Sequence, residues 1–87
     1  MRFLWTPVNI AHVTKHVPIS VAESVVRSVD QDALTPSRDG LTFTGFGSYS
    51  DEPYFIAYMT SRHQSDLQIY IITCYRKRRG KSRRRYQ

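Results

Sequence analysis

The chain has 87 residues, 40% of them apolar, and a formal net charge of +6. A chain of this length forms one small domain that buries only about 60 to 65% of its extended surface, so its core must be efficient or a partner must add burial. The single cysteine, Cys74, excludes an internal disulfide and is expected in the core. No apolar run is long enough for a membrane span or a signal peptide, so we expect a cytoplasmic protein.

The beginning of the chain predicts a strand and a helix. Met1–Trp5 is short and apolar with two aromatic residues, which favours a first strand. Thr6 and Pro7 then indicate a helix start, because Thr can cap free amides and Pro at the first helical position sacrifices no hydrogen bond. We expect this helix to extend from Pro7 to about His16. Pro18 ends it, since the residue before a proline is forced out of helical backbone.

A second helix is expected at about Val21–Val29. Ser20 and Glu23 match a capping box, in which the Ser side chain caps the first turn and the Glu side chain reaches back. Apolar residues follow at the helical spacing of i, i+3, i+4 and i+7, which predicts one buried stripe. They are Ala22, Val25, Val26 and Val29.

The second half of the chain predicts a series of strands. Asp30–Arg38 contains two Asp and a Pro and is typical of a loop, with or without a short strand. Asp39-Gly40 indicates a tight turn before a strand at Leu41–Gly47. Further strands are expected at Tyr54–Thr60 and at Leu67–Tyr75, which is the longest.

The chain closes with a strongly basic segment. Lys and Arg supply eight of the twelve residues from Arg76 to Gln87, with no acid among them, whereas the rest of the chain has five basic and seven acidic residues. Such a segment predicts a binding site for a polyanion. A helix over about Arg76–Tyr86 and a disordered tail that only aids solubility both stay open.

This order of elements indicates a single α+β domain over residues 1–87. We expect two N-terminal helices packed on one face of a mostly antiparallel sheet of four or five strands, with a basic C-terminal helix or tail. The opposite face is then free for a ligand or partner. Tyrosines are spread over the predicted strands, and some of them would face outward. They are Tyr49, Tyr54, Tyr58, Tyr70 and Tyr75.

Several motifs, in their order, resemble one protein family. Phe3-Leu-Trp5 and Asn9–Val17 look like that family's opening Trp and first helix, and Arg38-Asp-Gly40 looks like its strand opening. Tyr58–Arg62 looks like a strand end that carries an Arg, and Ile71–Tyr86 like the closing strand and Arg-rich helix. Over nearly its full length the chain resembles the BrnT-type toxins of bacterial type II toxin–antitoxin pairs, which are similar in fold to the RelE ribonucleases.

The resemblance implies a metal-independent endoribonuclease that needs no cofactor and inhibits translation by cleaving mRNA. In such an enzyme the ribose 2′-hydroxyl attacks the adjacent phosphorus, which requires a base, an acid and cations that stabilise the phosphorane oxygens. The resemblance also implies a ribbon-helix-helix antitoxin as partner, which binds operator DNA in the complex. A homodimer and a toxin–antitoxin hetero-oligomer both stay open, and no membrane partner is expected.

Candidate site residues follow from this chemistry. Arg62 and Arg76 are the candidates for a phosphate clamp, because the planar guanidinium can bind two phosphate oxygens at once. Arg62 also matches the family's strand-end position. The candidates for base and acid are His16, His63, Lys77 and Tyr86. The other basic residues of the C-terminal segment are expected to contact nucleic acid: Arg78, Arg79, Lys81, Arg83, Arg84 and Arg85.

Two features favour other interpretations. His12 and His16 are four residues apart on one helix face, a spacing that can bind a metal, but no further ligand cluster accompanies them and no metal site is predicted. Many family members carry a Glu in the last helix, where this chain has Ser82. The alternative is therefore a non-catalytic module that binds nucleic acid, or a protein-interaction module that recognises an acidic partner.

Overall fold

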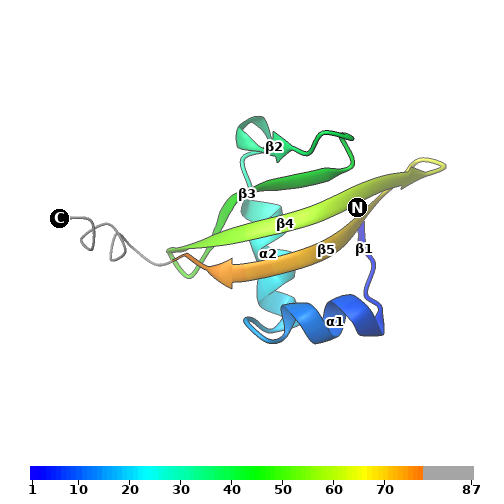
Figure 1. The fold of residues 1–87 in the computed structure, drawn as a ribbon. Helices are drawn as coiled ribbons and strands as arrows, with labels where there is room; N and C mark the ends of the chain where they lie inside the picture. Colours follow the sequence, from blue (N-terminus) through cyan, green and yellow to red (C-terminus); the bar gives the residue numbers. More distant parts are fainter. Residues whose placement is uncertain (78–87) are drawn as a thin grey trace.

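A five-stranded sheet with two helices forms the structure, a computed structural model that describes residues 1–77 (Figure 1). The strands, in sheet order, are β1 (Arg2–Phe3), β5 (Asp66–Arg76), β4 (Glu52–His63), β3 (Thr42–Tyr49) and β2 (Thr35–Pro36). β1 is parallel to β5, and all other neighbours are antiparallel. The predicted α+β class and mostly antiparallel sheet are confirmed. The predicted basic helix or tail falls almost wholly on residues 78–87, outside the described part.

Helix α1 (Pro7–Val13) begins where the sequence predicts. The Thr6 hydroxyl accepts from the Asn9 backbone N–H, and the Asn9 side chain accepts from the Thr6 N–H at 2.7 Å, which completes a capping box. The helix ends at Val13 rather than His16, because the backbone N–H of His16 bonds to the Val13 carbonyl three residues back and tightens the chain into a turn.

Helix α2 (Ile19–Ser28) begins earlier than expected, and the capping box predicted at Ser20 is wrong. Pro18 is the residue before the helix and provides no side-chain cap, so Ser20 lies within the first turn. The Glu23 carboxylate accepts instead from the indole N–H of Trp5 at 2.8 Å, which ties α2 to the segment after β1.

The core lies between α2 and one face of the sheet. The predicted stripe is buried: three of its residues lie in α2 and the fourth, Val29, directly follows the helix. The stripe packs against Ile56 of β4 and Ile71 and Cys74 of β5, which are at most 1% exposed. A Cβ atom added to Gly47 of β3 would collide with a backbone carbonyl of α2, so the helix approaches this strand closely.

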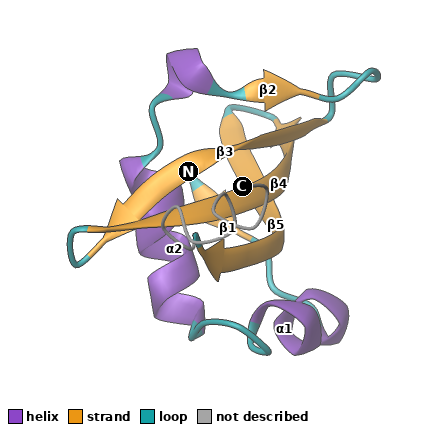
Figure 2. Ribbon diagram, turned by 60° about the vertical axis from the view of Figure 1, so that its left-hand side comes forward, coloured by secondary structure: helices purple, strands orange, loops and turns teal. Residues whose placement is uncertain are grey.

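Helix α1 lies along the β5 edge and does not share the sheet face with α2, which corrects the prediction that both helices cover one face (Figure 2). The reason is the buried Asn9, whose side-chain amide donates to the carbonyls of Leu4 and Ile71, both at 3.1 Å. These bonds attach α1 to the edge of β5, and Val13 extends from there into the core.

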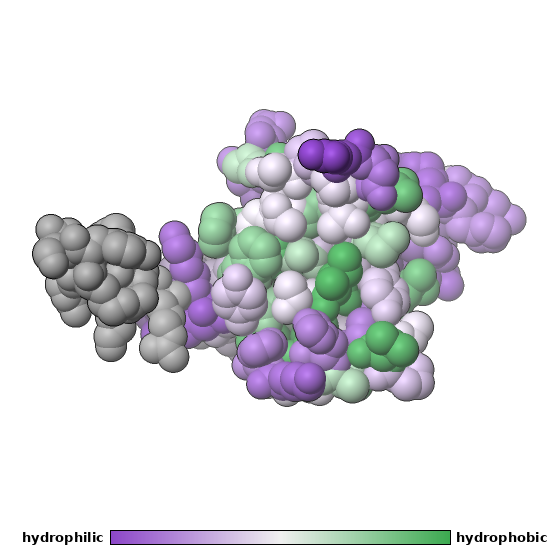
Figure 3. Space-filling model, viewed as in Figure 1, coloured by the Kyte–Doolittle hydropathy of each residue, from purple (hydrophilic) through white to green (hydrophobic). Residues whose placement is uncertain are grey.

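The sheet face opposite α2, here called the uncovered face, is not covered by a helix of the described residues 1–77. Figure 3 views this face: apolar and weakly polar residues gather over β3, β4 and β5, with hydrophilic residues around them. No helix among residues 1–77 is both long and apolar enough to cross a membrane.

Candidate nucleic-acid interface

Three aromatic side chains form a row across the uncovered face, here called the aromatic platform: Phe46 of β3, Phe55 of β4 and Tyr75 of β5. Phe46 pairs with Phe55 and Phe55 with Tyr75 in the strand register, and their ring centroids are 5.7 and 5.1 Å apart. Residues alternate between faces along a strand, so the buried neighbours Ile56 and Cys74 point to the core and these rings point away from it.

Two of the three platform rings are exposed, and the middle ring, Phe55, is partly buried between them. Phe46 is 53% exposed and Tyr75 is 42% exposed. Exposed aromatic surface that is contiguous across three strands is typical of a binding face rather than of scattered surface residues.

A cation lies directly on the platform. The Lys77 ammonium is 4.9 Å from the centroid of the Phe46 ring, within the range of a cation–π contact. The backbone N–H of Lys77 donates to the Pro53 carbonyl at 2.9 Å, so pairing between β4 and β5 continues past the strand end and positions the backbone of Lys77 beside the platform. The structure therefore places Lys77, one of the predicted site residues, against the aromatic platform.

An open pocket of about 450 Å³ adjoins the platform at the β5 edge, lined by His16, Thr73, Tyr75 and Arg76. The imidazole of His16 is 6.0 Å from the ring centroid of Tyr75. The Arg76 guanidinium also forms an ion pair with the Glu52 carboxylate at 3.2 Å. The structure thus brings together His16 and Arg76, two of the predicted catalytic candidates.

Arg62 does not join them. It pairs with Leu67, whereas Arg76 pairs with Tyr54, so eight residues of β4 separate the two positions. At about 3.4 Å per strand residue the separation is about 27 Å. The two arginines cannot hold one phosphate between them, and the expected clamp is not assembled.

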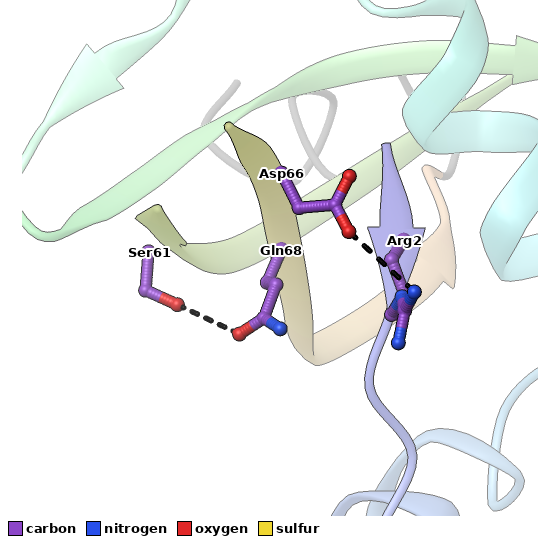
Figure 4. Close-up of polar contacts among 4 residues, drawn as sticks. All are labelled: Arg2, Ser61, Asp66 and Gln68. Carbon is purple, nitrogen blue, oxygen red and sulfur yellow. Dashed lines mark hydrogen bonds and ion pairs between the residues drawn. The ribbon is translucent and has the colours of Figure 1, made fainter. Parts of the chain in front are cut away.

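At the end of the sheet that carries Arg62 and His63, polar side-chain contacts connect neighbouring strands. Arg2 of β1 forms an ion pair with Asp66 at 3.5 Å, and the Ser61 hydroxyl donates to the Gln68 side chain at 3.4 Å (Figure 4). These contacts join β1, β4 and β5 where the long hairpin turns.

The remaining predicted site residues, Tyr86 and the six basic residues between Arg78 and Arg85, lie outside the described part of the chain. Within residues 1–77, no group of three or more His, Cys, Asp or Glu side chains is placed to hold a metal ion.

The sequence prediction missed Phe46 and Phe55. Their strands were predicted, but a lone Phe between two glycines and a Phe in an apolar run both resemble core residues. A signal existed in Gly45 and Gly47: two residues without side chains on one face of β3 suit close packing, here against Leu34 and α2, which assigns Phe46 to the opposite face.

No protein-family model, curated protein or solved structure matches this chain. The function is therefore inferred from the geometry and chemistry of the uncovered face.

Proposed function

We propose that this protein binds single-stranded RNA on the uncovered sheet face, with bases stacked on the aromatic platform. The observation that carries the proposal is the in-register row of Phe46, Phe55 and Tyr75 beside Lys77. Unpaired bases stack on exposed aromatic side chains of a sheet, whereas paired bases within a duplex cannot.

The charge distribution supports an anionic ligand. Arg76 and Lys77 end the described chain next to the platform and begin a segment in which six further residues are Lys or Arg. Cations at this position can contact the phosphates that connect the stacked bases, and each neutralised phosphate of a single strand adds about −0.7 to the slope of log affinity against log salt.

Two tyrosines provide a matched test. Tyr75 and Tyr49 are 42% and 40% exposed, but only Tyr75 belongs to the platform. Base stacking on an aromatic side chain contributes about 1 to 3 kcal/mol, so Tyr75→Leu should weaken binding of a fluorescein-labelled single-stranded RNA by about fivefold or more in an anisotropy titration. Tyr49→Leu should bind as the parent does. Equal losses in the two variants would remove the basis for a specific stacking site.

A second pair of variants tests the charge. Lys77→Ala and Arg62→Ala remove the same charge at opposite ends of the sheet. We expect Lys77→Ala to lower the magnitude of the salt slope by about 0.7 and Arg62→Ala to leave it unchanged. Identical slopes for the two variants would mean that RNA contacts the protein without regard to the platform.

A second candidate function is favoured by the pocket that His16 shares with Arg76. An imidazole can accept or donate a proton near neutral pH, and a guanidinium can stabilise a charged phosphorane. With the resemblance to BrnT-type toxins, this pocket supports a metal-independent endoribonuclease that inhibits translation. A ribbon-helix-helix antitoxin as partner and a cytoplasmic location belong to the same candidate function.

Cleavage can be separated from binding with two substrates. The candidate nuclease should cleave an RNA oligonucleotide in EDTA, and a 2′-deoxyribose at the cleaved position should stop the reaction while binding persists. His16→Ala should abolish cleavage and His63→Ala, a histidine at the far turn, should not. An intact RNA after prolonged incubation with the parent protein would leave binding alone as the function.

A further inference from the structure

A second, smaller pocket lies where α1 meets β5. Its volume is about 190 Å³, and its lining residues are Val8, Asn9, His12, Tyr70 and Ile72. Sites for drug-sized ligands occupy about 300 to 1,000 Å³. The smaller cavity, here called the His12 pocket, therefore suits a single planar ring system.

The His12 pocket is connected to the platform through side-chain rings. The His12 and His16 rings are 6.5 Å apart, and the His16 and Tyr75 rings are 6.0 Å apart. Together with the contacts of Phe55 and Phe46, these pairs form a continuous row of five rings from β3 to the first helix. Each step is comparable to the distance between successive nucleotides of an extended single strand.

The polar groups of the lining restrict what can enter. The side-chain amide of Asn9 already has hydrogen-bond partners within the protein, because its nitrogen donates to two backbone carbonyls and its oxygen accepts from Thr6. The imidazole of His12 and the hydroxyl of Tyr70, 3.5 Å from the Thr6 hydroxyl, remain beside apolar Val8 and Ile72. Among residues 1–77, no acidic side chain lines either pocket, so a ligand on an anionic backbone is favoured over a basic one.

We infer that the His12 pocket receives one nucleobase of the same RNA strand, beyond the bases stacked on the aromatic platform. This inference rests on the proposed function. A base that stacks on a ring of the lining, His12 or Tyr70, is bound by its face, so the pocket adds affinity and length dependence with little sequence preference.

The test uses a length series and two matched variants of the full chain. Val8 is 73% exposed at the pocket rim, so Val8→Phe fills the pocket without disturbing the core. Ala11→Phe adds the same ring at an exposed position of α1 that does not line the pocket. Labelled oligouridylates of three to eight nucleotides are titrated with the parent and both variants, and circular dichroism checks the fold of each.

We expect all three proteins to bind the trinucleotide equally. In the parent and in Ala11→Phe, the affinity should rise by about fivefold or more when the strand becomes long enough to reach the pocket. Val8→Phe should lose this rise. If Val8→Phe keeps it, or weakens the trinucleotide as much as longer strands, the His12 pocket does not hold a base and only the inference fails. If the parent binds no oligonucleotide of any length, the proposed function fails too.

Discussion

Substitution of Asn9 should destabilise the domain more than any other change of a polar residue in α1. Asn9 is 2% exposed, and four hydrogen bonds connect its side chain to Thr6, Leu4 and Ile71. A hydrogen bond contributes about 0.5 to 1.5 kcal/mol net, so Asn9→Ala should lower the free energy of unfolding by about 2 to 6 kcal/mol. The total free energy of unfolding of a domain of this size is about 4 to 13 kcal/mol.

Asn9→Asp keeps the side-chain volume and should destabilise the domain more than Asn9→Ala does at neutral pH. The side chain would direct a charged oxygen at the Leu4 and Ile71 carbonyls in place of an N–H donor, within a buried site. Burial raises the pKa of the introduced carboxyl in the folded state. The loss of unfolding free energy is therefore largest above that pKa and becomes smaller as the pH falls below it, because the protonated acid is neutral and can donate one hydrogen bond.

Urea unfolding followed by circular dichroism measures both effects. Thr14→Ala is the control, since it removes an exposed side-chain hydrogen bond to the Ile10 carbonyl at the end of the same helix and should cost less than about 1 kcal/mol. A loss of under about 1 kcal/mol for Asn9→Ala, or a pH-independent loss for Asn9→Asp, would refute the role of Asn9 in attaching α1 to β5.

Three further outcomes are expected. Glu52→Gln releases Arg76 from its ion pair, which is worth at most about 1 kcal/mol at the surface. It should therefore raise RNA affinity by about two- to fivefold more than Asp51→Asn, which removes the same charge one residue away. Equal gains in the two variants would show that only the net charge matters. Gly47→Ala should lower the urea midpoint strongly, because its methyl group meets a backbone carbonyl of α2; an unchanged midpoint would contradict the close packing. Burial raises the pKa of Cys74 to about 11, so iodoacetamide at pH 8 should label this thiol only in urea. The free energy of unfolding should fall as pH rises from about 9 to 11, because the thiol ionises at lower pH in the unfolded chain. Rapid labelling of the folded chain would show that the thiol is accessible.

Local signals in the sequence predicted most of the elements. The cap at Thr6, the proline after it and the apolar period from Ala22 to Val29 act within one or two helical turns, and the structure confirms both helices. The three main strands were expected from apolar runs but are longer than predicted. Their polar ends, such as Ser61 to His63, have no hydrophobic signal and become strand only because a partner strand continues beside them.

The candidate site depended on pairing between distant segments. The Phe46–Phe55 pair follows from the turn at Ser50 and Asp51, whose positive φ angles close a two-residue hairpin without a glycine. The pairing of Phe55 with Tyr75 depends in addition on a bulge in β5, where Ala57 pairs with Thr73 but Tyr58 pairs with Ile71. A register shift of one residue would move these rings to the opposite face.

The sequence by itself determined the composition of the candidate interface: aromatic strands, a basic end and two histidines four residues apart. The tertiary structure decided which of these residues meet. It placed His16 and Lys77 beside the platform and left Arg62 about 27 Å from Arg76 along β4. The physical reason is that propensity and periodicity act between neighbours in the chain, whereas strand register and the attachment of α1 through Asn9 are set by contacts between residues as far apart as Asn9 and Ile71.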